Sequence, residues 1–223
     1  MGNSPGIEID LMASYPRTKR DFKQRATEKT SEDRTIARQF GRKFFDGDRR
    51  NGYGGFSYDP RFWTPVVPAF KRHFSLKPGD RILDVGCAKG FMLHDFHELI
   101  PGLEVKGIDV SGYAIEHALD SMKPYVSVGD ARNLPFPDDS FDVAISVTTI
   151  HNLNREDCIV ALQEIERVSR RGAFVTVDAY RTEEERMAME AWNLTALTVL
   201  HVDEWKELFS DAGYSGDYYW FMP

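Results

Sequence analysis

Small residues and an acid recur at short spacing in the middle of the chain. Asp84, Gly86, Ala88 and Gly90 lie in the run ILDVGCAKG, whose first residues are apolar over the length of a strand. Small side chains at a turn let the backbone approach a ligand closely, and open α/β sheets bind ligands at the carboxyl ends of their strands. A glycine turn also occurs as a plain tight connection, so this run alone leaves both interpretations open.

Two further acids favour the ligand-binding interpretation. Asp109 ends a second strand-like run, GIDV, where an acid can accept hydrogen bonds from both hydroxyls of a ribose. Asp130 ends a third such run, and Val110 and Ala131 add apolar surface. An adenine ring needs apolar faces and an acceptor for its exocyclic amine, so these residues suit it. The pattern therefore indicates a site for an adenosyl cofactor.

The run from Lys77 to Asp178 resembles the class I S-adenosylmethionine-dependent methyltransferases, in the broad group that acts on small molecules. ILDVGCAKG resembles the family's glycine motif, GIDVS its ribose-binding acid, and GDARNLPFPDDSFDVAIS its adenine-binding region and fourth strand. The resemblance implies that S-adenosyl-L-methionine is the cofactor. It implies cofactor contacts from Asp84, Gly86, Cys87, Ala88, Gly90, Asp109, Val110, Asp130, Ala131 and Ser146. Ala88 replaces the family's middle glycine, which a backbone contact tolerates.

His151 is the candidate for acid–base chemistry. Methyl transfer is an in-line displacement, so the main need is to hold the acceptor atom about 3 to 3.5 Å from the methyl carbon, and a general base is optional. His151 follows the run FDVAISVTTI, at the mouth where an acceptor is expected. A histidine there can serve as a base, or it can cap the strand or pack against the cofactor.

The loop GYGGFSY, residues 52–58, is the second catalytic candidate. Glycines between aromatic residues suit a lid that closes over a site and excludes water, so we expect Tyr53 or Tyr58 to contact cofactor or acceptor. A packed surface loop is the alternative. The flanking arginines are expected to meet an anionic group of the acceptor: Arg49, Arg50 and Arg61.

The elements that must position these residues alternate in type. From Arg81 onward apolar runs of strand length alternate with stretches of helical periodicity. This predicts an α/β fold, a Rossmann-like three-layer sandwich with a mostly parallel sheet. We expect a single domain over residues 31–223, made of an N-terminal helical cap (31–76) and a cofactor-binding core (77–223), after a flexible arm (1–30).

The end of the chain departs from the family pattern. The family usually closes its sheet with a hairpin of two strands, whereas only DYYWF remains here. A missing strand leaves an exposed sheet edge that something must cover. The candidates are the segment NLTALTVL and the partner in a homodimer.

The composition limits the cellular compartment and the partners that we expect for the protein. The 223 residues carry a net charge of −7, with no apolar run of bilayer length and no secretory signal, so we expect a cytoplasmic protein that does not meet the membrane. Two cysteines and scattered histidines predict neither disulfides nor a metal site. Residues 17–50 hold 12 Lys or Arg against 6 Asp or Glu. A basic segment can meet nucleic acid, but a solvated helical face is favoured in an acidic chain.

The sequence thus predicts S-adenosylmethionine-dependent methyl transfer to O, N or C of a small, possibly anionic molecule. Methyl transfer to RNA or protein is an alternative, favoured by the basic segment and opposed by the acidic remainder. A non-catalytic partner or sensor that binds the cofactor is another. A nicotinamide-dependent dehydrogenase is disfavoured, because the turn lacks the G-x-G-x-x-G spacing and because that activity would not explain Asp130.

Overall fold

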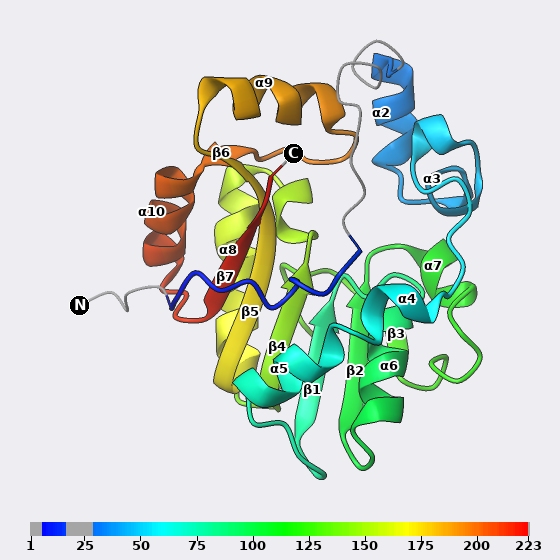
Figure 1. Cartoon of the computed structure of the whole chain (residues 1–223), viewed down its shortest axis with the longest axis vertical. Coiled ribbons are helices and arrows are strands. Elements are labelled where there is room, and N and C mark those ends of the chain that lie inside the picture. The colour runs from blue at the N-terminus through cyan, green and yellow to red at the C-terminus, as the bar shows by residue number, and fades with distance from the viewer. Residues whose placement is uncertain (1–5, 17–28, 223) are drawn as a thin grey trace.

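The strands form one sheet in the computed structural model, which describes residues 6–16 and 29–222. They are β1 (Arg81–Val85), β2 (Glu104–Asp109), β3 (Val126–Val128), β4 (Phe141–Val147), β5 (Ser169–Tyr180), β6 (Leu200–His201) and β7 (Asp217–Phe221). The order is β3-β2-β1-β4-β5-β6, and β7 also pairs with β5. Each of these pairings is parallel (Figure 1).

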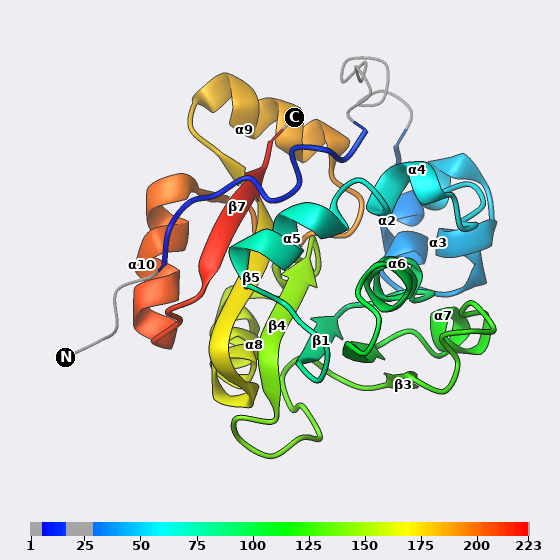
Figure 2. The same ribbon diagram turned by 60° about the horizontal axis from the view of Figure 1, so that its bottom comes forward.

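Helices cover both faces of the sheet (Figures 1 and 2). On one face lie α5 (Val67–His73) and α6 (Phe91–Leu99), and on the other α8 (Arg155–Val168) and α10 (Val202–Ala212). Each presents an apolar stripe to the strands, and two buried clusters result, one per face. The predicted Rossmann-like three-layer fold is confirmed. Among the described residues, the helices are too short or too polar to cross a membrane.

The remaining helices lie at the carboxyl edge of the sheet. They are α2 (Ser31–Ala37), α3 (Arg42–Asp46), the 3-10 turn η1 (Arg49–Asn51), α4 (Pro60–Trp63), α7 (Gly112–Glu116), the 3-10 turn η2 (Ile150–Asn152) and α9 (Glu183–Trp192). The periodicity of residues 32–45 predicts one helix, but Phe40 has a φ of 48°, which ends α2 before α3 begins.

The helix α5 departs from the expected cap of residues 31–76. The ring of Phe70 packs edge-on against Phe96 at 5.8 Å and against Phe174 of the sheet at 5.2 Å. Burial of this aromatic contact holds α5 on the sheet face, in the core layer. We therefore use the name cap for residues 31–63 only.

Residues 6–16, named the strap, cover the edge of the sheet at β7. The N–H of Gly6 donates to Gly216 O at 3.1 Å, that of Tyr218 to Ile7 O at 3.1 Å, and that of Ile9 to Tyr218 O at 2.9 Å. Glu8 also pairs with Arg181. Pairing of this kind removes the exposed donors and acceptors of an edge strand.

The strap corrects two expectations. A flexible arm was predicted for residues 1–30, but residues 6–16 are docked by main-chain bonds and by the buried side chain of Leu11; residues 1–5 and 17–28 lie outside the described residues. The edge was expected to need NLTALTVL or a dimer partner. NLTALTVL supplies only Leu200, the first residue of β6, which pairs with the far end of β5, and the chain's own strap covers β7.

Candidate functional site

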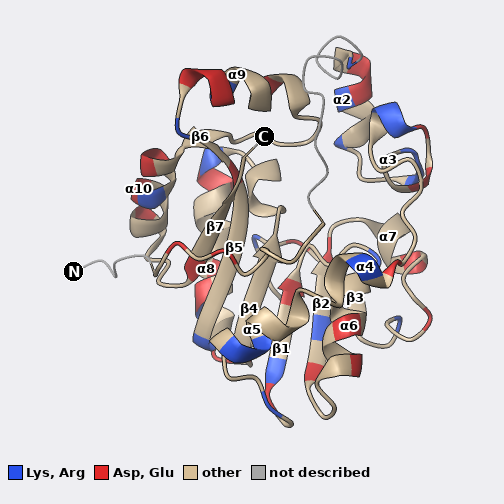
Figure 3. Cartoon of the chain, in the orientation of Figure 1, with Lys and Arg blue, Asp and Glu red and all other residues tan. Residues whose placement is uncertain are grey.

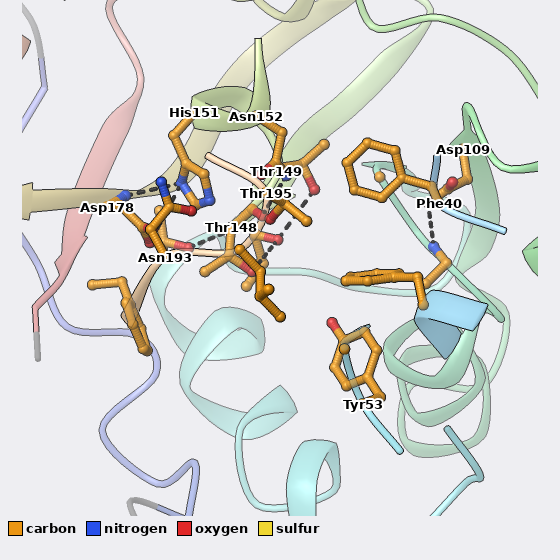
Figure 4. Close-up of a pocket in the computed structure, with 18 of the residues that line it drawn as sticks. Phe40, Tyr53, Asp109, Thr148, Thr149, His151, Asn152, Asp178, Asn193 and Thr195 are labelled. Atoms are coloured by element: carbon orange, nitrogen blue, oxygen red, sulfur yellow. Dashed lines mark hydrogen bonds and ion pairs between the residues drawn. The ribbon is translucent and has the colours of Figure 1, made fainter. Parts of the chain in front are cut away.

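A cavity of about 1410 Å³ lies where the carboxyl ends of the strands meet the cap. The ends of β1, β2, β4 and β5 form its floor, and residues of the cap, the strap and the segment after α9 form its walls. Figure 4 shows Asp109, Phe40 and Tyr53 on one side of the cavity, and His151, Asp178 and Thr149 on the other. The cavity therefore brings six of the predicted cofactor residues together with Tyr53 and His151.

The glycine turn needs its small residues. Gly86 has a φ of 90°, and a Cβ on it would lie 2.0 Å from Oγ1 of Thr149. Ala88 has a φ of 48°, a conformation that costs an alanine free energy. Gly86 and Ala88 line the cavity, whereas Gly90 starts α6 with a φ of 76° and is not part of its wall.

Asp109 is held by the turn beside it. Its Oδ2 accepts the N–H of Ala88 at 2.7 Å, and its Oδ1 accepts the N–H of Ser111 at 2.8 Å. Burial raises the pKa of Asp109, and the two N–H donors act against that shift. The carboxylate lines the cavity at the end of β2. A buried acid in this position has the donor-accepting oxygens that a ribose diol requires.

Asp84 and Cys87 lie beside a smaller cavity of about 70 Å³, next to the first. Aromatic rings of Tyr53, Phe56 and Trp63 form other parts of its wall. Burial, and then the charge of Asp109, raise the pKa of Asp84 to about 7. A carboxylate among aromatic faces suits a cationic group.

Asp130, which was predicted to face the adenine, is already paired. Its two oxygens accept from Nε and Nη2 of Arg132 at 3.0 and 2.6 Å, and these bonds hold the pKa of Asp130 below its usual range. Nη1 of Arg132 reaches Asp157 at 2.8 Å. Asp130, Arg132, Val110 and Ala131 all line the cavity. An adenine amine would thus meet an acid whose position is fixed by Arg132.

Ser146 and Tyr58 line neither cavity. The Oγ of Ser146 is buried and donates to Val85 O at 2.8 Å, which ties β4 to β1. The hydroxyl of Tyr58 donates to Asp95 of α6 at 2.5 Å. Both contacts hold the framework together. Tyr53 does line the cavity, with its ring 4.2 Å from that of Phe56.

His151 lies on the wall opposite Asp109, in η2. Its Nδ1 accepts the N–H of Asp178 at 2.9 Å, so the neutral ring carries its proton on Nε2. Burial lowers the pKa of His151, while the charge of Asp178, 3.6 Å away, acts against that shift. In this state Nε2 is a hydrogen-bond donor and not a base.

Polar residues around His151 were missed by the sequence analysis. Thr148, at the end of β4, has a φ of 52°, which is rare for a β-branched residue, and such strain clusters at functional sites. The polar residues that share this wall are Thr148, Thr149, Asn152, Asn193 and Thr195. The run TTIHN after an apolar strand was a signal for the first three. No periodic pattern marked Asn193 or Thr195.

The strap also contributes to the site. Met12 and Tyr15 line the cavity, and the ring of Tyr15 packs on Phe62 and Trp63 of the cap at 5.4 and 4.9 Å.

The three arginines that flank the loop of residues 52–58 lie in different surroundings. Arg49 lines the cavity, whereas Arg50 and Arg61 are exposed and pair with nearby Asp48 and Asp59.

Comparison with known proteins agrees with this geometry. Residues 82–172 match the family model described as a methyltransferase domain. The chain is 35% identical to the tRNA (carboxymethyluridine(34)-5-O)-methyltransferase of Arabidopsis thaliana over 63% of the chain and 33% of that protein. It is 32% identical to the demethylmenaquinone methyltransferase of Lysinibacillus sphaericus over 47% of the chain and 46% of that protein.

The fold has solved counterparts. A SAM-dependent methyltransferase from Methanosarcina mazei has a TM-score of 0.51 and 20% identity, over 63% of this chain and 82% of the other. The chain spans half or less of the length of the curated relatives just described. The matched residues include the glycine turn, Asp109 and Asp130, and together with the fold they support a Rossmann-like, S-adenosylmethionine-dependent methyltransferase domain of class I in this chain.

Proposed function

We propose that the chain transfers the methyl group of S-adenosylmethionine to O, N or C of a small molecule bound in the cavity between β4 and the strap. The observation that carries this proposal is the single cavity with Asp109 at one end and the polar wall of His151 at the other. A cofactor at the first end and an acceptor at the second would share one continuous space. This is the arrangement that an in-line displacement requires.

The residues at the first end fit the cofactor. Asp109 would hold the ribose, and Asp130 with Val110 and Ala131 the adenine, while Gly86 and Ala88 leave room for backbone contacts. S-adenosylmethionine supplies a methyl group on a positively charged sulfur. Asp84 and the nearby aromatic rings offer a negative charge and π-faces to the cationic part of such a molecule.

At the second end, His151 would orient the acceptor. Since its Nδ1 is engaged by Asp178, Nε2–H can donate to an oxygen of the acceptor. An anionic or carbonyl oxygen suits that donor best. Arg49 offers a charge for an anionic group, and the aromatic side chains of Tyr15, Trp63 and Tyr53 favour a flat, apolar body.

RNA is a second candidate acceptor, favoured by the 35% identity to a tRNA methyltransferase. The charges of the cap give less support to RNA as the acceptor. Arg34 and Arg38 donate to main-chain carbonyls of Asn193 and Ala196, and Figure 3 shows acidic residues mixed with basic ones in α2 and α3. These basic side chains hold the cap to the segment after α9, which favours the small acceptor.

Calorimetric titration with S-adenosylmethionine and S-adenosylhomocysteine tests the cofactor. A screen that detects S-adenosylhomocysteine release from small phenols, carboxylic acids, quinols and unmodified tRNA then tests the acceptor. Turnover with a small compound supports the proposal, and turnover with tRNA alone overturns the choice of acceptor. Binding without turnover of any acceptor would favour a partner or sensor role instead.

A further inference from the structure

A partly buried ion pair joins the cap to the glycine turn. Lys89 directly follows Ala88 in the turn, and its side chain is 8% exposed. Its Nζ donates to Oδ1 and Oδ2 of Asp46 at 3.0 and 2.7 Å. Asp46 is the last residue of α3. The one ion pair thus spans two parts of the site that lie 43 residues apart in sequence.

The pair also fixes the loop that carries Tyr53. The N–H of Phe56 donates to Asp46 Oδ1 at 3.0 Å, and Lys89 donates to Phe56 O at 2.8 Å. Both main-chain groups of Phe56 are therefore held by the pair. The hydroxyl of Tyr113 in α7 adds a third donor to Asp46 at 2.7 Å. Burial opposes ionisation of Asp46, but these donors lower its pKa to about 2.

Lys89, through its neighbour Ala88, and Phe56 have further connections to the site. Ala88, next to Lys89, donates its N–H to Asp109. Phe56 packs its ring against Tyr53 at 4.2 Å and against Phe91, the first residue of α6, at 4.7 Å. An unbroken series of contacts thus runs from the proposed ribose acid through the ion pair to the cavity face of the loop.

We propose that Lys89 and Asp46 are positioning residues that hold the loop of residues 47–58 over the cofactor, so that order in the loop and affinity for the cofactor are coupled. The inference rests on the proposed function, because its ligand is the cofactor. Loss of the Asp46 charge leaves Lys89 buried without its partner, and loss of Lys89 removes the donor that holds Asp46 and Phe56 together, so in both cases the loop is free to move away. A loop that leaves the site removes Tyr53 from the cavity wall and opens it to water.

Hydrogen exchange of the ligand-free protein tests the positioning directly. In Lys89→Met and Asp46→Asn we expect exchange of residues 42–58 to rise by about tenfold or more, while that of β1 and β4 stays as in the parent protein. The matched controls are Lys123→Met and Asp120→Asn, which remove an exposed ion pair of the same kind. Unchanged exchange at residues 42–58 in both site variants would overturn the positioning role.

Calorimetry with S-adenosylhomocysteine tests the coupling. We expect Lys89→Met to weaken binding about tenfold and Lys89→Arg to recover most of the loss, because the charge and donors return. Faster exchange with unaltered affinity in Lys89→Met would mean that the loop is held by the pair but is not coupled to the cofactor. If the parent protein itself binds no S-adenosylhomocysteine, the proposed function fails, and exchange still decides what the pair does.

Discussion

The main-chain N–H of Ala88 donates to Oδ2 of Asp109 at 2.7 Å, which joins the turn after β1 to the acid at the end of β2. The same carboxylate holds Ser111 through Oδ1, and Ser111 Oγ donates to Phe40 O in the cap. Asp109 is thus both a proposed ligand for ribose and a link between the turn and the cap. A change at Asp109 will act on both.

Asp109→Ala should abolish most cofactor binding. Two charge-assisted hydrogen bonds to a ribose are together worth about 3 kcal/mol, so we expect affinity for S-adenosylhomocysteine to fall by roughly 100-fold in calorimetry. Glu104→Ala on the exposed start of the same strand is the control and should bind as the parent does. Retention of affinity within threefold in Asp109→Ala would remove Asp109 from the ribose site.

Cofactor affinity should depend on pH through Asp84. Its pKa is raised to about 7, so it is mostly protonated below pH 7 and must ionise to hold a cation. Affinity should therefore be full above pH 7 and fall by up to about tenfold per unit as the pH drops below it. Titrations between pH 5.5 and 8.5 measure this. Asp84→Asn should bind weakly with a flat profile, and a flat profile in the parent protein would contradict the role.

Ala88→Gly should stabilise the protein. The φ of 48° is unfavourable for alanine and open to glycine, so we expect a gain of about 1 kcal/mol and a rise in Tm of roughly 2 to 4 °C. The same substitution at Ala161, buried within α8, is the control and should lower stability. Thermal unfolding followed by circular dichroism gives both values. A lower Tm for Ala88→Gly would show that contacts of the Ala88 methyl group stabilise the protein by more than its backbone conformation costs.

His151 should orient the acceptor without a change in its own protonation state. If Nε2–H orients the acceptor, kcat/KM for an acceptor found in the screen should stay level between pH 6 and 8 when S-adenosylmethionine is saturating at each pH, since burial lowers the pKa of His151 and keeps the ring neutral. His151→Phe should reduce kcat by about 100-fold and leave S-adenosylhomocysteine affinity intact. A rate that rises with pH across this range, and loses that dependence in His151→Phe, would instead make His151 a base.

Release of the strap should expose the edge of β7. Leu11 is 4% exposed and anchors the strap, so Leu11→Asp should detach it and promote self-association through the free edge. Sedimentation velocity measures the oligomeric state. Ile7→Asp places the same charge on the same strap at a side chain that is 59% exposed, and it should remain like the parent protein. Equal behaviour of the two variants would mean that the strap does not protect the edge.

The sheet and the place of Asp109 at its carboxyl edge could be predicted because their signals are local. Apolar runs set the strands, and the position of Asp109 at the end of one such run fixes its place at the carboxyl edge. The orientation of single side chains could not be predicted in this way. Ser146 turned out to bond between strands, and Tyr53 and Tyr58 lie in one loop but face different surroundings. Such a loop has no period from which a direction can be inferred.

Two other features differ in how far the sequence could have revealed them. The ion pair of Asp46 and Lys89 arises from tertiary packing, and no spacing rule connects its members. The strap did have a signal. Ile7, Ile9 and Leu11 alternate with polar residues, which is the period of a strand. The segment was too short and too polar overall for that alternation to outweigh its composition.

The hydrogen bond between Ile7 and Asp217 spans 210 positions, so synthesis must reach Asp217 before the strap can find its partner. Contacts this far apart in sequence form late, because a long loop must close first. The glycine turn and β2, by contrast, pair over short distances. During synthesis the cofactor end can therefore take shape while the wall made by Met12 and Tyr15 still waits for β7, and the acceptor end of the cavity is the last part of the site to be built.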